Sequence, residues 1–286
     1  MHTMETIKNR RRRQRIHIPL CDETELGFPN KWMTAIPVKL PLKGGGMEER
    51  VLFVNPAREE SCLYKKDYGR YEREDGIVRF DCGGRAFEWK FCCGGYKPSH
   101  FPPETAGVIG CDFMRANALA LDFGHRALYT SPGMEGLHPG RLGYFFRFKD
   151  NGEGCPAIAL CLGGKMFSCR FTCESVSMMR LKDLKKDGFE SEQVIVEDEE
   201  DNPGAQAWYK VSFSCVDGSE EFRRPKRVKF ADIFICVDGF CGGRKIRRNE
   251  IWLGPYLMQK DGAVIDFGIG AFYKLKYGMG SETNNE

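Results

Sequence analysis

The chain has 286 residues, of which 42% are hydrophobic and 29% charged, and its formal net charge is +3. This length accommodates one large domain or two lobes that each bury a core. No apolar run approaches the ~18 residues that a membrane-spanning helix needs, and no apolar segment follows the N-terminal arginines as in a secretory signal. We therefore expect neither membrane insertion nor export.

The 13 cysteines form no metal-binding pattern. Cys169 with Cys173, and Cys236 with Cys241, are not followed by the second Cys or His pair that a zinc site needs. Without an export signal, reduced and mostly buried thiols are expected in a cytoplasmic and/or nuclear protein. No nucleotide-binding or serine-hydrolase motif is present, so the sequence predicts no cofactor and no metal.

The N-terminal segment 1–30 is predicted to be a disordered basic arm, because a run of charges cannot bury apolar surface. Its consecutive arginines are Arg10, Arg11, Arg12 and Arg13. Such a run is typical of a nuclear localisation signal or of a segment that contacts nucleic-acid phosphates. A solvated terminus without a ligand is the third interpretation, and the sequence does not separate the three.

Strand-like patterns begin in the segment 31–134, which we interpret as the first lobe. Residues 35–42 alternate around two prolines, which suits an edge strand. An apolar run at 51–54 follows a glycine turn and ends at Asn55. Residues 76–80 and 86–92 flank the sequence CGGR, and a glycine pair between two alternating runs predicts a hairpin.

Two stretches, 108–131 and 252–275, share one pattern at a constant offset and without a gap. The identical positions are Gly110 and Gly254, Met114 and Met258, the Asp-Phe-Gly sequences that begin at Asp122 and Asp266, Ala127 and Ala271, and Tyr129 and Tyr273. Each copy has the pattern of a buried strand end, a glycine, a short helix and a hairpin. The repetition predicts two copies of one structural unit.

The second copy closes a second predicted lobe, 153–276, which follows a linker at 135–152. Residues 155–175 open this lobe with a strand, a glycine pair and another strand, as residues 36–57 do in the first lobe. A short helix is expected near residue 180. The acidic segment near 188–204 has no counterpart in the first lobe and is interpreted as an insertion, and residues 277–286 form a tail.

The duplicated pattern resembles the end of a lobe in the aspartic proteases, both the retropepsin-like and the two-lobed pepsin-like types. In that family two apolar residues and a glycine pass beneath the active-site loop, and a short helix and a closing hairpin follow. The matching residues are Val108, Ile109 and Gly110 in the first lobe, and Trp252, Leu253 and Gly254 in the second. The resemblance covers about residues 35–130 and 153–276, and implies an all-β, two-lobed β-barrel fold with short helices and lobes related by duplication.

The resemblance also implies where catalytic loops should lie. In the family each lobe supplies an Asp-Thr/Ser-Gly loop, and the two aspartates share a proton and activate a water molecule. Here the corresponding positions fall within one or two residues of Asn55 and Thr172. Because an amide and a hydroxyl cannot act as a carboxylate base, we expect no catalytic residues and interpret the chain as a pseudoprotease.

Other aspartates do not replace the missing pair. Asp81 precedes a Cys-Gly-Gly sequence, but too few residues separate it from Gly110 for the strands and the hairpin that the fold places between them. Asp217 and Asp238 are expected in hairpin turns. Asp122 and Asp266 are expected to cap the hairpins of the repeats. An active aspartic endopeptidase is therefore the less favoured interpretation.

Two further signals concern partners. Val194, Ile195 and Val196 precede a run of acids, a pattern that resembles a SUMO-interacting motif, although a strand that leads into a solvated acidic loop is the favoured interpretation. Basic clusters in the second lobe include the arginines Arg223, Arg224, Arg247 and Arg248, which could contact nucleic acid or could pair with the acidic segment.

The sequence therefore predicts a non-catalytic binding or scaffold module that mediates protein–protein interactions, with a protein or peptide partner in the groove between the lobes or on a strand edge. The alternative is a nucleic-acid-associated factor that acts through the basic arm and the basic clusters. No membrane partner is expected. The oligomeric state is left open, since tandem lobes would allow a monomer.

Overall fold

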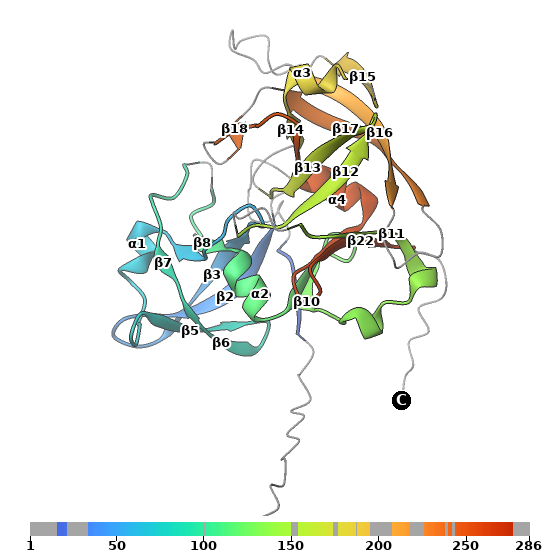
Figure 1. Cartoon of the computed structure of the whole chain (residues 1–286). Helices are drawn as coiled ribbons and strands as arrows, with labels where there is room; N and C mark the ends of the chain where they lie inside the picture. The colour runs from blue at the N-terminus through green and yellow to red at the C-terminus, as the bar shows by residue number, and fades with distance from the viewer. Residues whose placement is uncertain are drawn as a thin grey trace, which may run out of the picture.

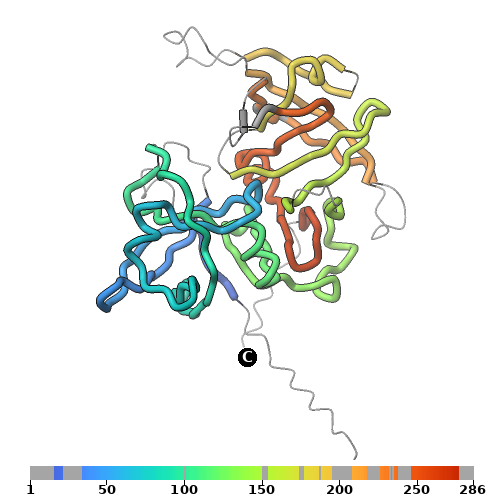
Figure 2. The backbone as a smooth tube through the Cα atoms, turned by 60° about the vertical axis from the view of Figure 1, so that its left-hand side comes forward, coloured from blue at the N-terminus to red at the C-terminus, as the bar shows by residue number. Residues whose placement is uncertain are grey.

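The computed structural model describes residues 16–21, 34–99, 101–149, 154–173, 177–186, 188–194, 208–217, 226–237, 240–241 and 244–276. Two lobes lie side by side, one formed by the first half of the chain and one by the second, and a shared group of strands joins them (Figures 1 and 2). None of the helices in these ranges is long and apolar enough to span a membrane.

The first lobe is built on a seven-stranded sheet with the order β6-β5-β2-β3-β8-β4-β7. Its elements are β2 (Ala35–Pro41), β3 (Met47–Val54), β4 (Cys62–Leu63), α1 (Lys65–Tyr68), β5 (Ile77–Cys82), β6 (Arg85–Lys90), β7 (Cys92–Cys93), β8 (Thr105–Ile109) and α2 (Cys111–Ala116). The hairpin predicted around CGGR is confirmed as β5–β6, whose turn residues Gly83 and Gly84 have φ of 60° and 73°. Glycine adopts this left-handed backbone at little cost.

The second lobe repeats this plan in another seven-stranded sheet, with the order β12-β13-β20-β14-β17-β16-β15. Its elements are β12 (Ala157–Leu162), β13 (Lys165–Phe171), β14 (Ser177–Met179), α3 (Leu181–Leu184), β15 (Phe189–Val194), β16 (Trp208–Asp217), β17 (Lys226–Val237), β20 (Glu250–Leu253) and α4 (Pro255–Asp261), with the small ladder β18 (Phe240–Cys241) and β19 (Arg244–Lys245). The hairpins β2–β3 and β12–β13 confirm the predicted parallel between the two lobe beginnings.

A six-stranded sheet joins the lobes, with the order β1-β10-β9-β21-β22-β11. Its strands are β1 (His17–Pro19), β9 (Leu119–Asp122), β10 (Ala127–Thr130), β11 (Leu142–Arg147), β21 (Ala263–Asp266) and β22 (Ala271–Leu275). The hairpins predicted for the two repeats are β9–β10 and β21–β22.

The repeats pair with each other through their equivalent residues. Leu121 lies opposite Ile265, its own counterpart at the sequence offset, in the antiparallel ladder between β9 and β21. Two matching hydrogen bonds flank this pair, from Phe123 N to Ala263 O at 3.0 Å and from Phe267 N to Leu119 O at 2.9 Å. Because an antiparallel ladder is two-fold symmetric about such a pair, a local two-fold axis relates the repeats, as the internal duplication predicts.

Two of the predicted boundaries differ from the structure. β1 lies within the segment 1–30 that was predicted to be a disordered arm, so the prediction is wrong for residues 16–21; Ile18 is buried and pairs with Leu128. The predicted linker 135–152 contains β11, which completes the joining sheet beside β22. Both strands are short and pair with distant segments, and a pattern of a few residues does not reveal such pairing.

The core consists of aliphatic and aromatic side chains on the inner faces of the sheets. In the first lobe, Phe80 stacks on Phe87 at 5.6 Å between ring centroids, and Phe113 of α2 packs 5.4 Å from Phe87. In the second lobe, Phe213 and Phe230 are 5.2 Å apart. These rings pack the interior of each lobe, and the candidate site lies at the ends of β3 and β13.

Candidate functional site

The first candidate loop begins at the end of β3, where Asn55 is 3% exposed. β3 runs parallel to β8, and the Asn55 amide continues this ladder by donating to the Ile109 carbonyl at 3.0 Å. The Asn55 side chain turns back on its own loop, because Oδ1 accepts a hydrogen bond from the Ala57 amide at 2.9 Å. This local arrangement is an Asx turn, and it holds the loop closed over the strand end.

The second candidate loop begins in the same way at the end of β13. Thr172 is fully buried, and its amide donates to the Leu253 carbonyl at 3.0 Å. β13 is parallel to β20 just as β3 is parallel to β8. Asn55 and Thr172 therefore occupy equivalent positions in the two lobes, each beside the apolar-apolar-Gly motif.

Two serines complete this symmetry, and the sequence analysis missed both. Ser61 Oγ accepts the Gly110 amide, and Ser177 Oγ accepts the Gly254 amide, each at 2.9 Å. Asp112 in turn fixes Ser61, whose Oγ donates to Oδ1 of Asp112 at 2.6 Å. Each bond satisfies a buried backbone donor where the chain leaves a strand for a helix. An ungapped alignment of the two lobes from Asn55 and Thr172 misses this pair, because Ser61 is six residues beyond Asn55 and Ser177 is five beyond Thr172.

Gly110 must be glycine because the loop crosses directly over it. An added Cβ would lie 2.8 Å from the Glu60 carbonyl carbon and 2.9 Å from the Arg58 carbonyl oxygen, both backbone atoms. We expect Gly110→Ala to lower the free energy of unfolding by about 2 to 4 kcal/mol, since backbone must move to relieve the overlap. Chemical denaturation of the full chain measures this change.

The matched control is Gly95→Ala, where an added Cβ meets nothing within 4 Å. This variant should change the stability by less than about 1 kcal/mol, because no atom has to move. Equal effects of the two substitutions would show that the loop does not press on Gly110.

A cluster of apolar side chains from the second lobe covers the end of the first loop. Met178, Cys236, Ile246 and Trp252 are buried together, and Ala57 and Trp208 pack against them. Trp252 belongs to the apolar-apolar-Gly motif, but it faces this cluster, whereas its neighbour Leu253 faces the main core. The two lobes therefore meet through apolar contacts beside the loop that begins at Asn55.

A buried ion pair supports the second loop. Nε of Arg170, on β13, lies 2.7 Å from Oε1 of Glu250, on β20, although its N–H is not aligned as a hydrogen bond. The guanidinium carbon of Arg170 lies 5.6 Å from the centre of the Trp252 ring. Both charged side chains are more than nine-tenths buried, so they neutralise each other beneath the interface.

The remaining buried aspartates have structural partners. Asp122 accepts the His125 amide at 2.9 Å, and Asp266 accepts the Gly268 amide at 2.9 Å, so both cap hairpin turns as predicted. Burial raises the pKa of Asp266, although hydrogen bonds from Ser131 and the turn amides oppose this rise. Neither aspartate belongs to the loops at Asn55 and Thr172.

Asp81 and Asp217 lie away from the two loops as well. Asp81 is on β5, where Oδ1 accepts the Gly84 amide at 3.2 Å. Asp217, which is predicted to lie in a hairpin turn, is instead the last residue of β16, is buried, and accepts the Phe145 amide of β11 at 2.6 Å. Its contact with a strand from elsewhere in the chain could not be read from local turn chemistry. Asp238 lies outside the described residues.

Within the described residues, the first loop thus carries the side-chain amide of Asn55, and the second loop carries the hydroxyl of Thr172 at the equivalent position. Over the ranges that the structure covers, no group of three or more His, Cys, Asp or Glu side chains could hold a metal ion. Two cavities, of about 380 and 290 Å³, open elsewhere, and neither is lined by Asn55 or Thr172.

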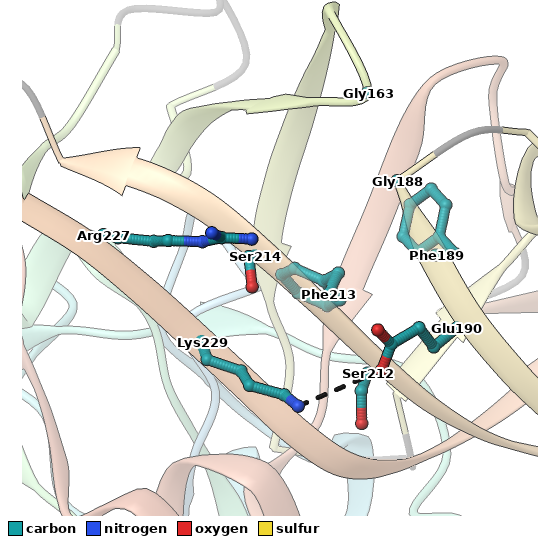
Figure 3. Close-up of a pocket in the computed structure, with 9 residues that line it drawn as sticks. All are labelled: Gly163, Gly188, Phe189, Glu190, Ser212, Phe213, Ser214, Arg227 and Lys229. Carbon is teal, nitrogen blue, oxygen red and sulfur yellow. Dashed lines mark ion pairs between the residues drawn. The ribbon is translucent and has the colours of Figure 1, made fainter.

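The larger cavity lies on the second lobe, beside the edge strand β15 (Figure 3). Phe189 and Phe213 form one wall, with ring centroids 5.7 Å apart. Arg227 and Lys229 extend across it from β17, and Lys229 Nζ lies 3.9 Å from a carboxylate oxygen of Glu190. The cavity therefore combines an aromatic wall with basic and acidic groups.

The residues predicted to contact partners are only partly described. Val194 ends β15, whereas Ile195 and Val196 lie outside the described residues, as do Arg223, Arg224 and the arginines Arg10, Arg11, Arg12 and Arg13. Arg247 and Arg248 are exposed next to the start of β20, and the Arg247 amide donates to Glu250 at 2.8 Å. The nucleic-acid and SUMO hypotheses remain predictions.

Comparison with known proteins identifies the fold and not a close relative. No protein-family model and no curated protein sequence matches the chain. The crystal structure of basic 7S globulin from soybean, which has a pepsin-like aspartic protease fold, is similar with a TM-score of 0.54 and 8% sequence identity, over 91% of this chain and 94% of that chain. The protein therefore has an all-β, two-lobed aspartic-protease-like fold, as the duplicated motif predicted.

Proposed function

We propose that the protein is a pseudoprotease, a non-catalytic member of this fold that binds an extended segment of a protein partner. The observation that supports the absence of catalysis is the pair of loops at Asn55 and Thr172. Peptide hydrolysis by the mechanism of the fold needs two carboxylates that share a proton. An amide held by its own loop and a fully buried hydroxyl supply neither the base nor the acid.

The edge strand β15 supports the binding role. It pairs with β16 on one side and ends the sheet on the other, and its four central residues, 190–193, are all exposed. Both faces of the strand are thus accessible, unlike β12 at the opposite edge, where most side chains are buried. Within the described chain, β15 offers free backbone donors and acceptors to which an added strand could pair.

The chemistry around β15 indicates the kind of segment that would bind. Glu190 and Glu192 project from the strand, and the sequence beyond Val194 contains a further acidic run at 197–201. A partner strand with basic side chains would meet these acids, and the cavity bordered by Phe189 could take one of its apolar side chains. Backbone pairing would provide affinity, while these side-chain contacts would provide selectivity.

The expected result of a catalytic test is that the full chain does not hydrolyse a peptide library between pH 3 and 7. Cleavage that is blocked by pepstatin and lost on substitution of a carboxylate would overturn the proposal. A separate selection of random peptides on the immobilised protein tests binding. We expect basic, β-branched sequences that protect residues 189–194 from hydrogen exchange.

A charge-reversal variant tests whether the selected peptides bind along β15 and not along another edge strand. The double change Glu190→Lys and Glu192→Lys should weaken binding of the selected peptides at least tenfold, because the acids would be replaced by like charges. Glu88→Lys, on the edge strand β6 of the first lobe, makes the same kind of change at another exposed edge and should leave binding unaltered. Equal effects at both edges, or peptides that protect another region, would contradict binding along β15.

A further inference from the structure

Two thiols from different lobes converge on the first candidate loop. Cys111 is the first residue of α2 and is buried, and its Sγ donates to the Pro56 carbonyl at 3.2 Å. Cys155 precedes β12 in the second lobe and is half-buried, and its Sγ donates to the Ala57 carbonyl at 3.2 Å. These acceptors belong to adjacent residues, so both thiols lie at the same short stretch of the first loop, where each influences the pKa of the other.

The pair is chemically asymmetric. The neighbouring Cys111 thiol and the positive charge of Arg170 lower the pKa of Cys155, against the effect of its burial. The neighbouring Cys155 thiol, together with burial, raises the pKa of Cys111. The charged groups that act on the pair are Arg115, Arg170, Glu59 and Asp112. Cys155 is half-buried and lies in the field of the Arg170 guanidinium, whereas Cys111 is fully buried, so Cys155 is the more accessible partner and the one that forms the thiolate.

We propose that Cys111 and Cys155 are an oxidation site at which a hydroperoxide creates a disulfide between the two lobes. The Cys155 thiolate attacks one oxygen of hydrogen peroxide, so that an S–O bond forms, the O–O bond breaks and hydroxide leaves. Cys111 then loses its proton to that hydroxide, which becomes water. Its sulfur attacks the sulfenic sulfur of Cys155, and the S–O bond breaks as the S–S bond forms. With one further proton taken from solvent, a second water leaves, and the two thiols have supplied the two electrons that reduce the peroxide.

The disulfide would covalently link the two lobes beside the loop that begins at Asn55. It would connect the first residue of α2 to the segment just before β12 and enclose the joining strands β9, β10 and β11 in a covalent loop. Disulfide formation removes both thiol protons, so the Pro56 and Ala57 carbonyls would each lose a weak hydrogen bond. The two lobes would gain a covalent crosslink. A crosslink that closes a long loop restricts the unfolded chain, and we expect the unfolding midpoint to rise by about 5 °C. This proposal is independent of the peptide-binding role of β15.

One other thiol pair provides an internal comparison. Cys62 and Cys92 lie opposite each other on the parallel strands β4 and β7. Burial raises the pKa of Cys62 to about 11 and also raises that of Cys92. Neither sulfur therefore forms a thiolate readily near neutral pH, and this pair should oxidise more slowly than Cys111 with Cys155.

Peptide mapping after oxidation tests the proposal. The reduced full-length protein is treated with a small excess of hydrogen peroxide at low protein concentration, blocked with an alkylating reagent, and digested with trypsin and a glutamate-specific protease. These enzymes release Cys111 in the peptide 105–115 and Cys155 in the peptide 154–165, separate from Cys62 and Cys92. The expected product is the linked pair of these peptides, lighter by two hydrogens than the sum of the free thiols.

Variants make the result specific. Cys111→Ser and Cys155→Ser should each abolish the linked product and the rise in the unfolding midpoint. Cys161→Ser should retain both, because Cys161 is exposed and shares the Cys155 peptide without taking part. The assignment would be overturned if Cys111 were recovered as a free thiol under conditions that oxidise Cys155 to the sulfinic or sulfonic acid. It would also be overturned if Cys62 and Cys92 formed a disulfide in preference to Cys111 and Cys155. Circular dichroism of each reduced variant establishes that it is folded.

Discussion

Replacing Arg170 with methionine should destabilise the protein by about 3 to 5 kcal/mol, the largest effect that we expect from a single substitution. Arg170 on β13 and Glu250 on β20 are both buried, and Nε of Arg170 lies 2.7 Å from Oε1 of Glu250 across these paired strands. Methionine preserves much of the apolar stem of arginine but leaves the Glu250 carboxylate in the protein interior without its cation. Denaturant unfolding of the full chain measures the loss.

A double-mutant cycle separates the pair from its surroundings. Glu250→Met alone should cost a similar amount, whereas the double variant should cost much less than the sum, because two apolar side chains replace two charges. The matched control is Arg79→Met, which breaks an ion pair with Glu88 at 2.9 Å whose side chains are 68% and 61% exposed. This loss should be below about 1 kcal/mol. Additive costs in the cycle would show that Arg170 and Glu250 act independently.

The duplicated motif allowed the fold to be predicted because its information is local and occurs twice. Gly110 and Gly254 each donate their amide to a buried serine, and the hairpins at Asp122 and Asp266 follow at the same spacing. The pairing of Leu121 with Ile265 could not be read from either copy alone, since it requires that the copies meet about a two-fold axis.

The contacts between the lobes could not be predicted in the same way. Cys155 is one of 13 cysteines. The residues next to it in the sequence do not indicate that it lies near Cys111 or donates to the Ala57 carbonyl. The motif predicts that Trp252 lies beneath the second loop, but its side chain packs with Met178, Cys236 and Ile246 in the apolar cluster where the lobes meet. Residues far apart in the chain determine both environments, whereas sequence patterns report only the strand or helix that carries a residue.

Introducing aspartate at the two loop positions should destabilise the protein rather than create a protease. Asn55→Asp and Thr172→Asp place carboxylates at positions that are 3% and 0% exposed. Burial disfavours the ionised form, so the pKa of each new carboxyl group should be raised above its unfolded value of about 3.9. We expect each change to cost about 2 to 4 kcal/mol at pH 7.

The dependence on pH follows from the sign of this shift. A carboxyl group with a raised pKa in the folded state destabilises the fold fully above that pKa, and the penalty disappears as the pH falls through it towards the unfolded value. The variants should therefore approach wild-type stability in acid, when each is compared with the wild type at the same pH. Gln193→Glu, an amide-to-carboxylate change on the exposed part of β15, should show little penalty at any pH.

The same variants test the loops as a catalytic framework. The Asn55 side chain is bound to the Ala57 amide, and the first loop is packed against the second lobe, so a carboxylate at this position would not be free to activate water for attack on a peptide. The double variant should remain inactive towards a peptide library at acidic pH, where it is folded. Pepstatin-sensitive cleavage by the double variant would show that the missing carboxylates are all that separates this protein from a protease, and that the packing of the loops is no obstacle to catalysis.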